Sequence, residues 1–150
     1  MLAIEAPPLS VRQASENDWK FIYSSWIKSS ALSWYKANRF WIKPKLLSPD
    51  FDEIYSAGVA KMIDRLRSHD STLFAVATPP RDGDFIVGWC CLGPGLVHYC
   101  YVRESFRRAG VASMLIGDRH RVVCTSWTLD CEAISRDKPG VLQYEPSKRR

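Results

Sequence analysis

Apolar residues repeat at helical spacing in two stretches of the first half of the chain. Between residues 54 and 66 they follow one another at steps of 1, 4, 3, 1 and 3, which predicts a helix beginning at about residue 50. Ser15 followed by Asp18 is typical of a helix N-cap, and it predicts an earlier helix over about 17–30. Each helix has one apolar face to bury. The apolar positions are Trp19, Phe21, Ile22, Trp26 and Ile27 in the first helix, and Ile54, Tyr55, Val59, Met62, Ile63 and Leu66 in the second.

Apolar, β-prone segments separated by turns predict a series of strands. A short strand is expected at 11–14, and the Pro-Pro-Arg-Asp-Gly-Asp turn separates hairpin strands at 72–77 and 85–92. Gly-Pro-Gly then reverses the chain into a strand at 96–102. The remaining pattern predicts a helix at 108–120, a strand at 122–129, helical turns at 131–137 and a last strand at 141–144. This order of helices and strands is typical of a mixed fold, an α/β fold in the broad sense and α+β in the narrower classification.

Length and composition favour one domain spanning residues 1–150, because 46% of the residues are hydrophobic and 25% are charged. No apolar run approaches the ~18–20 residues of a membrane span, and the N-terminus has no signal-like pattern, so we interpret the protein as cytoplasmic. The net charge of +5 suits an acidic partner: coenzyme A, nucleic acid or an acidic protein.

The five cysteines are odd in number and lack the C-x-x-C spacing of a zinc site. We therefore predict small buried thiols in a reducing compartment and no metal site. A catalytic pair of Cys100 with His98 is the alternative interpretation.

The segment 102–112 combines cations with flexible and small residues where a strand-like run passes into a helix-like run. Unpaired amides at a helix start attract anions, and Gly110 lets backbone approach a phosphate without a Cβ. The spacing Arg-x-x-Gly-x-Ala, preceded by Val-x-x-x-Phe, resembles the acyl-coenzyme A pyrophosphate loop of the GCN5-related N-acetyltransferases. Ile-Val-Gly-Trp at 86–89 is similar to the family's apolar-Gly-aromatic pattern, and the order of elements over about 10–130 also matches.

The resemblance implies a mixed, mostly antiparallel central sheet flanked by helices, with a shortened C-terminus similar to that of small phage-encoded relatives. It implies transfer of an acetyl or short acyl group from acyl-coenzyme A to an amine. The family's loop amides bind the pyrophosphate, and the main chain of the preceding strand binds the pantetheine arm and polarises the thioester. Here these positions are Arg107, Arg108, Ala109, Gly110, Val111 and Ala112 in the loop, and Cys100, Tyr101 and Val102 in the strand.

The residues for proton transfer depart from the family pattern. Many relatives have a glutamate near the start of the fourth strand, and the matching position here is Leu96. His98, two residues further on, is the candidate base that the resemblance leaves. Tyr144 is the candidate acid, and Glu132 and Ser126 are lesser candidates. Because few residues follow position 120, we expect the acceptor pocket to be small or to be completed by a second subunit in a homodimer.

Two alternatives remain open. In residues 31–50, aromatic side chains mix with cations; such a segment either pins a long loop onto the core or stacks on bases and holds phosphates. The second choice would make the protein nucleic-acid-directed, as in relatives that resemble DNA-base-modifying enzymes. The candidate acceptor-binding residues there are Trp34, Tyr35, Arg39 and Trp41. Leu96 supports the other alternative, a degenerate protein that binds coenzyme A without catalysis.

Overall fold

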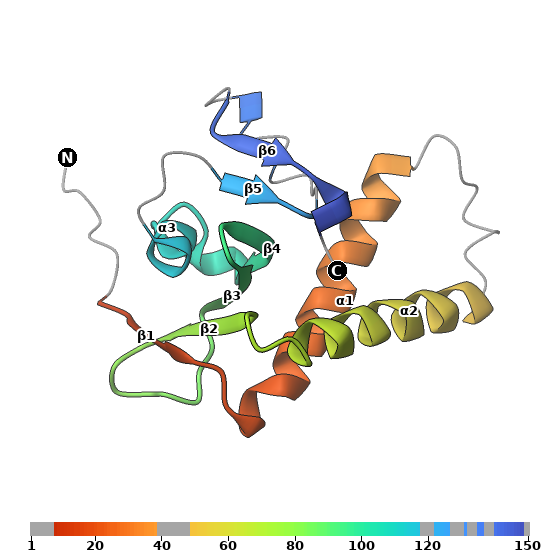
Figure 1. The fold of residues 1–150 in the computed structure, drawn as a ribbon. Helices are drawn as coiled ribbons and strands as arrows, with labels where there is room; N and C mark the ends of the chain where they lie inside the picture. The colour runs from red at the N-terminus through yellow and green to blue at the C-terminus, as the bar shows by residue number, and fades with distance from the viewer. Residues whose placement is uncertain are drawn as a thin grey trace.

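The computed structural model describes residues 8–38, 49–117, 122–126, 131, 135–136 and 140–148. Within these residues the centre of the fold is a six-stranded sheet whose strands lie side by side in chain order (Figure 1). The strands are β1 (Ser10–Gln13), β2 (Leu73–Thr78), β3 (Gly88–Gly93), β4 (Leu96–Val102), β5 (Val122–Cys124) and β6 (Leu142–Tyr144). The range predicted for β4 agrees with the structure residue for residue, whereas β3 begins three residues later than predicted.

The directions of the strands correct the expectation of a mostly antiparallel sheet. β1 to β4 pair antiparallel, whereas β5 runs parallel to both β4 and β6. Helix α3 (Val111–Ile116) connects β4 to β5. A strand reached through a helical crossover runs in the same direction as the strand before it. The sheet is therefore mixed, and the shortened C-terminus stays a prediction.

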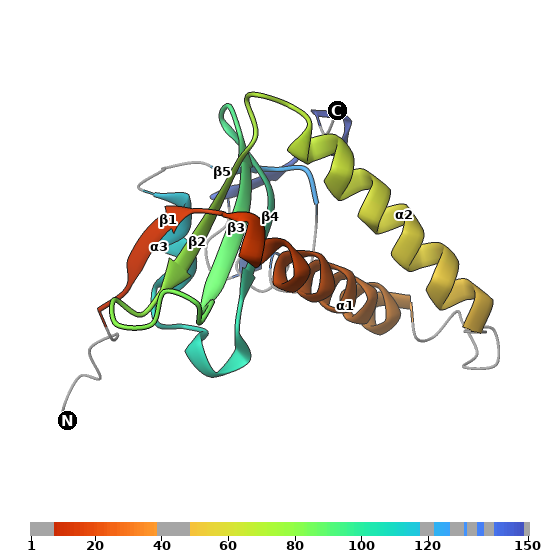
Figure 2. The same ribbon diagram turned by 90° about the horizontal axis from the view of Figure 1, so that it is seen from below.

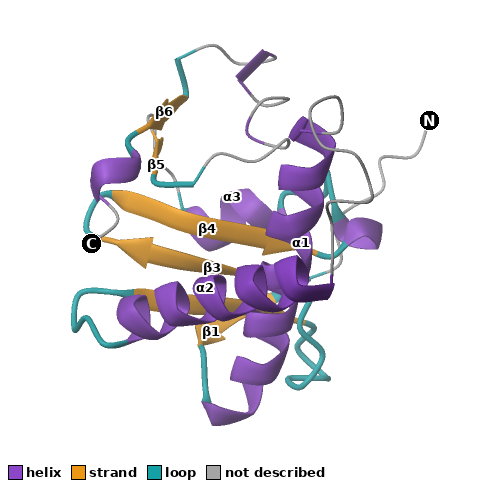
Figure 3. Cartoon of the chain, turned by 90° about the vertical axis from the view of Figure 1, so that its right-hand side faces the viewer, coloured by secondary structure: helices purple, strands orange, loops and turns teal. Residues whose placement is uncertain are grey.

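Helices cover both faces of the sheet. Figures 2 and 3 show α1 (Trp19–Asn38) and α2 (Pro49–Arg67) on one face and α3 on the other. Because side chains alternate along a strand, each face has its own core. On the α1 and α2 face the buried residues are Ile22, Trp26, Ile63, Leu66, Phe74, Val76, Ile86, Trp89, Cys91 and Tyr99. On the α3 face they are Ala75, Ala77, Val87, Cys90, Leu92, Val97, Val111, Leu115, Val122 and Cys124.

Helix α1 continues eight residues beyond the predicted end at Ser30, so the first part of the expected loop is helical. The serines that suggested an end are accommodated inside the helix. The Ser25 hydroxyl donates to Phe21 O at 2.7 Å, and the Ser29 hydroxyl donates to Ser25 O at 2.6 Å. A hydroxyl that bonds to the preceding turn no longer competes for the helix's own amides. Among the helices that the structure describes, none has the length and apolar character needed to cross a membrane.

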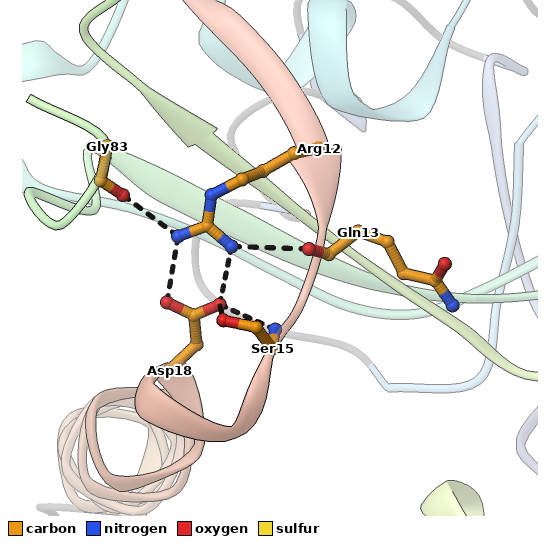
Figure 4. Close-up of polar contacts among 5 residues, drawn as sticks. All are labelled: Arg12, Gln13, Ser15, Asp18 and Gly83. Carbon is orange, nitrogen blue, oxygen red and sulfur yellow. Dashed lines mark hydrogen bonds and ion pairs between the residues drawn. The ribbon is translucent and has the colours of Figure 1, made fainter. Parts of the chain in front are cut away.

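A partly buried ion pair fixes the start of α1 against the sheet (Figure 4). The Arg12 guanidinium donates to both Asp18 carboxylate oxygens, at 2.6 and 2.9 Å, and to Gly83 O at 2.9 Å. The Ser15 amide donates to the same carboxylate at 2.7 Å, as the predicted N-cap requires. Asp18 is only 4% exposed. The hydrogen bond from Arg12 lowers the pKa of Asp18, and the two Ser15 hydrogen bonds add to this, although burial acts in the opposite direction.

We expect Asp18→Asn to lower the free energy of unfolding near neutral pH by about 1–3 kcal/mol, because Arg12 and the Ser15 amide lose a charged acceptor. The Asp18 pKa is lower in the folded chain than in the unfolded chain, so its stabilisation is complete above the ordinary aspartate pKa of about 3.9. That stabilisation is lost as the pH falls through the lowered folded value. Urea unfolding followed by circular dichroism at several pH values measures both effects.

The wild-type protein should therefore lose stability in acid, and the Asp18→Asn variant should show a flatter dependence there. Asp70→Asn makes the same chemical change at an exposed position and serves as the matched control. Equal stabilities and equal acid profiles for the two variants would contradict the prediction.

Candidate functional site

The loop between β4 and α3 contains two residues in the left-handed region. Arg108 has φ 63°, and it is the one non-glycine residue with positive φ in the part of the chain that the structure describes. Gly110, the N-cap of α3, has φ 81°. Residues with a positive φ cannot be part of a right-handed helix. The helix α3 therefore begins at Val111 and not at residue 108 as predicted. A positive φ at an arginine is uncommon and points to a constrained loop.

The two left-handed residues leave a row of backbone amides without a carbonyl to bind. Met114 N donates to Gly110 O at 3.0 Å, which closes the first turn of α3. Among the described residues, the amides of 108–112 donate to no backbone carbonyl outside that helix. Successive amides around left-handed turns form a concavity that suits an anion. The Arg108 side chain is exposed beside them and adds a positive charge.

Two arginines tie this loop to the sheet. Arg107 Nε donates to Val102 O at 3.1 Å, which joins the loop to the last residue of β4. The Arg103 guanidinium lies 4.5 Å from the ring centres of both Phe21 and Phe85. Its Nε also donates to the main chain of the segment before β3. Cation–π contacts of this kind hold the guanidinium in place, so the loop has a defined position relative to β4.

Gly88, in the apolar-Gly-aromatic pattern, explains how closely α3 approaches the sheet. A Cβ at this position would lie 2.8 Å from Tyr101 O and 3.2 Å from a methyl carbon of Val111. Glycine is therefore needed because β3 passes close to β4 and to the start of α3. The contact places the first turn of α3 directly over the strands.

β4 contains a bulge, and within the described residues β5 pairs with β4 only up to that bulge. Cys91 pairs with Tyr99 but Leu92 pairs with Val97, so His98 is an extra residue inserted in β4. β5 pairs with β4 at Leu96 and Val97 within the described residues, and the strands separate after that. The part of β4 that leads to the loop thus lies beyond the point of separation. This is the part that contains Cys100, Tyr101 and Val102.

Three of the candidate catalytic residues lie around the end of β5. His98 is 4% exposed, and its Nδ1 lies 2.9 Å from the hydroxyl oxygen of Thr125. Ser126 follows Thr125 directly, and its carbonyl accepts a long contact from the Cys131 thiol at 3.9 Å. Tyr144 is 49% exposed and pairs with the last residue of β5. No pattern of residue types points to Thr125, because only the pairing of strands brings it to His98.

The backbone of only two of the other candidate residues for catalysis and acceptor binding lies within the described residues. Trp34 and Tyr35 belong to α1, whereas Arg39, Trp41 and Glu132 lie outside the described residues. The nucleic-acid alternative, which depends on that segment, stays a prediction.

All five cysteines are free thiols, of which Cys100 and Cys131 are half-buried and the other three are buried. A hydrogen bond with Cys131, together with burial, raises the pKa of Cys124, and burial raises the pKa of Cys91. Both thiols therefore stay protonated at neutral pH, which disfavours them as nucleophiles. Within the described residues, no group of three or more potential ligand side chains could hold a metal ion.

The described part of the chain thus combines a bulged β4, a parallel β5 and a constrained loop leading into a helix, and its fold is similar to that of a solved acetyltransferase-like structure. No protein-family model matches the sequence, and no curated protein matches it. Solved structures do match. A proposed acetyl transferase from Pyrococcus furiosus is 15% identical with a TM-score of 0.53, over 92% of this chain and 82% of that one.

Two further matches are more distant in structure. A GCN5-related N-acetyltransferase from Rhodopseudomonas palustris is 18% identical with a TM-score of 0.49, over 77% of this chain and 65% of that one. PaiA N-acetyltransferase from Thermoplasma acidophilum, in complex with coenzyme A, is 16% identical with a TM-score of 0.42, over 89% of this chain and 75% of that one. The chain thus spans less than two thirds of the length of the Rhodopseudomonas protein. At these identities the likeness concerns the fold.

Proposed function

We propose that this protein binds an acyl-coenzyme A at the loop 107–112 and along β4, and that it transfers the acyl group to an amine. The observation that carries the proposal is the pair of left-handed residues, Arg108 and Gly110, in a loop where the amides of 108–112 donate to no backbone carbonyl outside α3 among the described residues. The fold shared with the Pyrococcus furiosus protein supports it.

The residues of the loop fit the chemistry of a pyrophosphate. Amides at 108–112 donate hydrogen bonds to phosphate oxygens, and the exposed Arg108 adds a cation that attracts the same charge. Arg107 holds the carbonyl of Val102 and thereby positions the loop relative to the strand. The main chain of Cys100, Tyr101 and Val102 would lie along the pantetheine arm.

Acyl transfer to an amine needs a neutral amine and a proton for the departing thiolate. His98 is the candidate for accepting the amine proton, and Tyr144 is the candidate for supplying the other proton. Thr125 and Cys124 connect the two candidates, because Thr125 contacts His98 and Cys124 pairs with Tyr144, and Ser126 follows Thr125 directly in the chain. Many members of the family have a glutamate as the base at the position of Leu96. If this protein binds acetyl-coenzyme A but transfers no acyl group, the alternative of a non-catalytic protein is favoured.

Gly110→Ala is expected to weaken acetyl-coenzyme A binding about tenfold or more, because alanine at a left-handed φ costs about 1–2 kcal/mol and the loop would relax. The measurement is the rise in melting temperature as acetyl-coenzyme A is titrated, since a ligand of the native state stabilises it. Thiol released from acetyl-coenzyme A with a panel of amines then measures transfer.

Gly95→Ala is the matched control for this variant. Gly95 also has a positive φ, 67°, and also has open space around its Cβ position, but it lies in the β3–β4 turn. It should lose similar stability while keeping the wild-type response to acetyl-coenzyme A. No ligand response in the wild-type protein at millimolar concentration would refute the proposed function, and equal responses in the two variants would refute the role of the loop.

A further inference from the structure

A buried hydrogen bond joins the bulge of β4 to the residue that follows β5. His98, the inserted residue, lies 2.9 Å through its Nδ1 from the Thr125 hydroxyl oxygen. Thr125 is completely buried and His98 nearly so. A hydrogen bond between two buried polar side chains stabilises the contact, and its loss is costly because water does not replace it.

The main chain makes a second connection at the same place. The Thr125 amide donates to Val97 O at 3.1 Å, one residue beyond Cys124, which pairs with Val97 in the parallel ladder. Thr125 therefore holds β4 twice, through its amide to Val97 and through its hydroxyl to His98. Both contacts come directly after the pair of Val97 with Cys124, which is the last pair of the parallel ladder within the described residues.

The neighbouring hairpin leaves room for the imidazole. A Cβ at Gly93 would lie 2.9 Å from His98 Nε2, so a side chain at that position would displace the ring. The bulge also changes which face the strand presents: Val97 belongs to the core under α3, whereas Tyr99 belongs to the core under α1 and α2. The ring of His98 is thus enclosed between the turn, the bulge and β5.

We infer that the His98–Thr125 hydrogen bond fastens β5 to the bulge of β4 and fixes the point at which the two strands separate. Thr125 is then a positioning residue, and the same hydrogen bond sets the orientation of the His98 ring. Their consequence for binding rests on the proposed function, because the edge of β4 beyond the bulge is where the pantetheine arm would lie. If β5 were released, it could shift along or toward that edge and close it.

Thr125→Val removes the hydroxyl while keeping the shape of the side chain, and Thr125→Ser keeps the hydroxyl. We expect amide hydrogen exchange at Thr125 and at β5 to rise about tenfold or more in the valine variant, and to stay near the wild-type rate in the serine variant. Acetyl-coenzyme A affinity should fall about tenfold in the first and be retained in the second. Wild-type exchange and affinity in Thr125→Ser would show that the hydrogen bond of the hydroxyl, and not the packing of the side chain, is responsible.

Thr78→Val is the matched control, because Thr78 is also buried, at 2% exposure, but lies in β2 away from this contact. It should leave exchange at β5 unchanged. Exchange at β5 that is as slow in Thr125→Val as in Thr125→Ser would overturn the inference. Should the valine variant not fold, wild-type exchange decides: protection of the Thr125 amide equal to that of β3 supports the fastening, and exchange as fast as in an exposed loop overturns it.

His98→Asn gives a second, independent comparison, since an asparagine side chain can place a polar atom close to the Nδ1 position. Slow exchange at β5 and retained acetyl-coenzyme A affinity would support a positioning role. Rapid exchange at β5 in His98→Asn, combined with slow exchange at β5 in Thr125→Val, would overturn the positioning role of the hydrogen bond. A wild-type protein that does not bind acetyl-coenzyme A would reject the proposed function and the binding consequence, while the exchange comparison would still decide whether the hydrogen bond fastens the strands.

Discussion

Replacing Trp89 with alanine is expected to lower the free energy of unfolding by about 3–5 kcal/mol, the range for removing a large buried aromatic side chain. Trp89 is fully buried, and its ring centre lies 5.3 Å from that of Trp26 and 5.7 Å from that of Tyr99. Its indole N–H donates to the Ser25 hydroxyl at 2.8 Å. The side chain therefore joins β3, β4 and α1, and its loss opens a cavity among all three.

Urea unfolding followed by circular dichroism measures this change without depending on tryptophan fluorescence. Phe85→Ala is the control, because Phe85 is 37% exposed and its truncation should cost clearly less. Trp89→Phe should fall between the two, since it keeps a ring but loses the indole donor. A Trp89→Ala variant no less stable than Phe85→Ala would show that the aromatic core is not arranged as described.

Gly88→Ala is expected to destabilise the protein by about 1–3 kcal/mol, as overpacking of a tight site does. The added Cβ would meet Tyr101 O at 2.8 Å, and a backbone oxygen cannot rotate away as a flexible side chain can. It would also press on Val111, the first residue of α3. We therefore expect the variant to bind acetyl-coenzyme A less tightly as well, because the loop before α3 moves with the helix.

Gly58→Ala makes the same chemical change with the opposite expected sign. Gly58 lies inside α2 with nothing within 4 Å of its Cβ position, so alanine should stabilise the protein by about 0.5–1 kcal/mol. Thermal and urea unfolding of both variants measure the difference. A Gly88→Ala variant as stable as Gly58→Ala would mean that β3, β4 and α3 are not packed as closely as the structure shows.

Local patterns predicted much of the fold. The apolar spacing of α2 and the turn residues around β4 act over a few positions, so they identify helices and strands directly. The same reasoning failed at the end of α1, where Ser25 and Ser29 bond to their own helix, and at the start of α3, where Arg108 takes a left-handed conformation. Residue type alone predicts neither the continuation of α1 past its serines nor the left-handed conformation of Arg108.

The sequence by itself determined the order of the helices and strands, the range of β4 and the position of the basic, glycine-containing loop between a strand and a helix. Those properties depend on neighbours a few residues apart. The tertiary structure alone decided that β5 runs parallel to β4, that His98 is the inserted residue of a bulge, and that Thr125 meets it. These depend on which strands pair and in which register, and the energy that decides register comes from packing and hydrogen bonds between segments far apart in the chain.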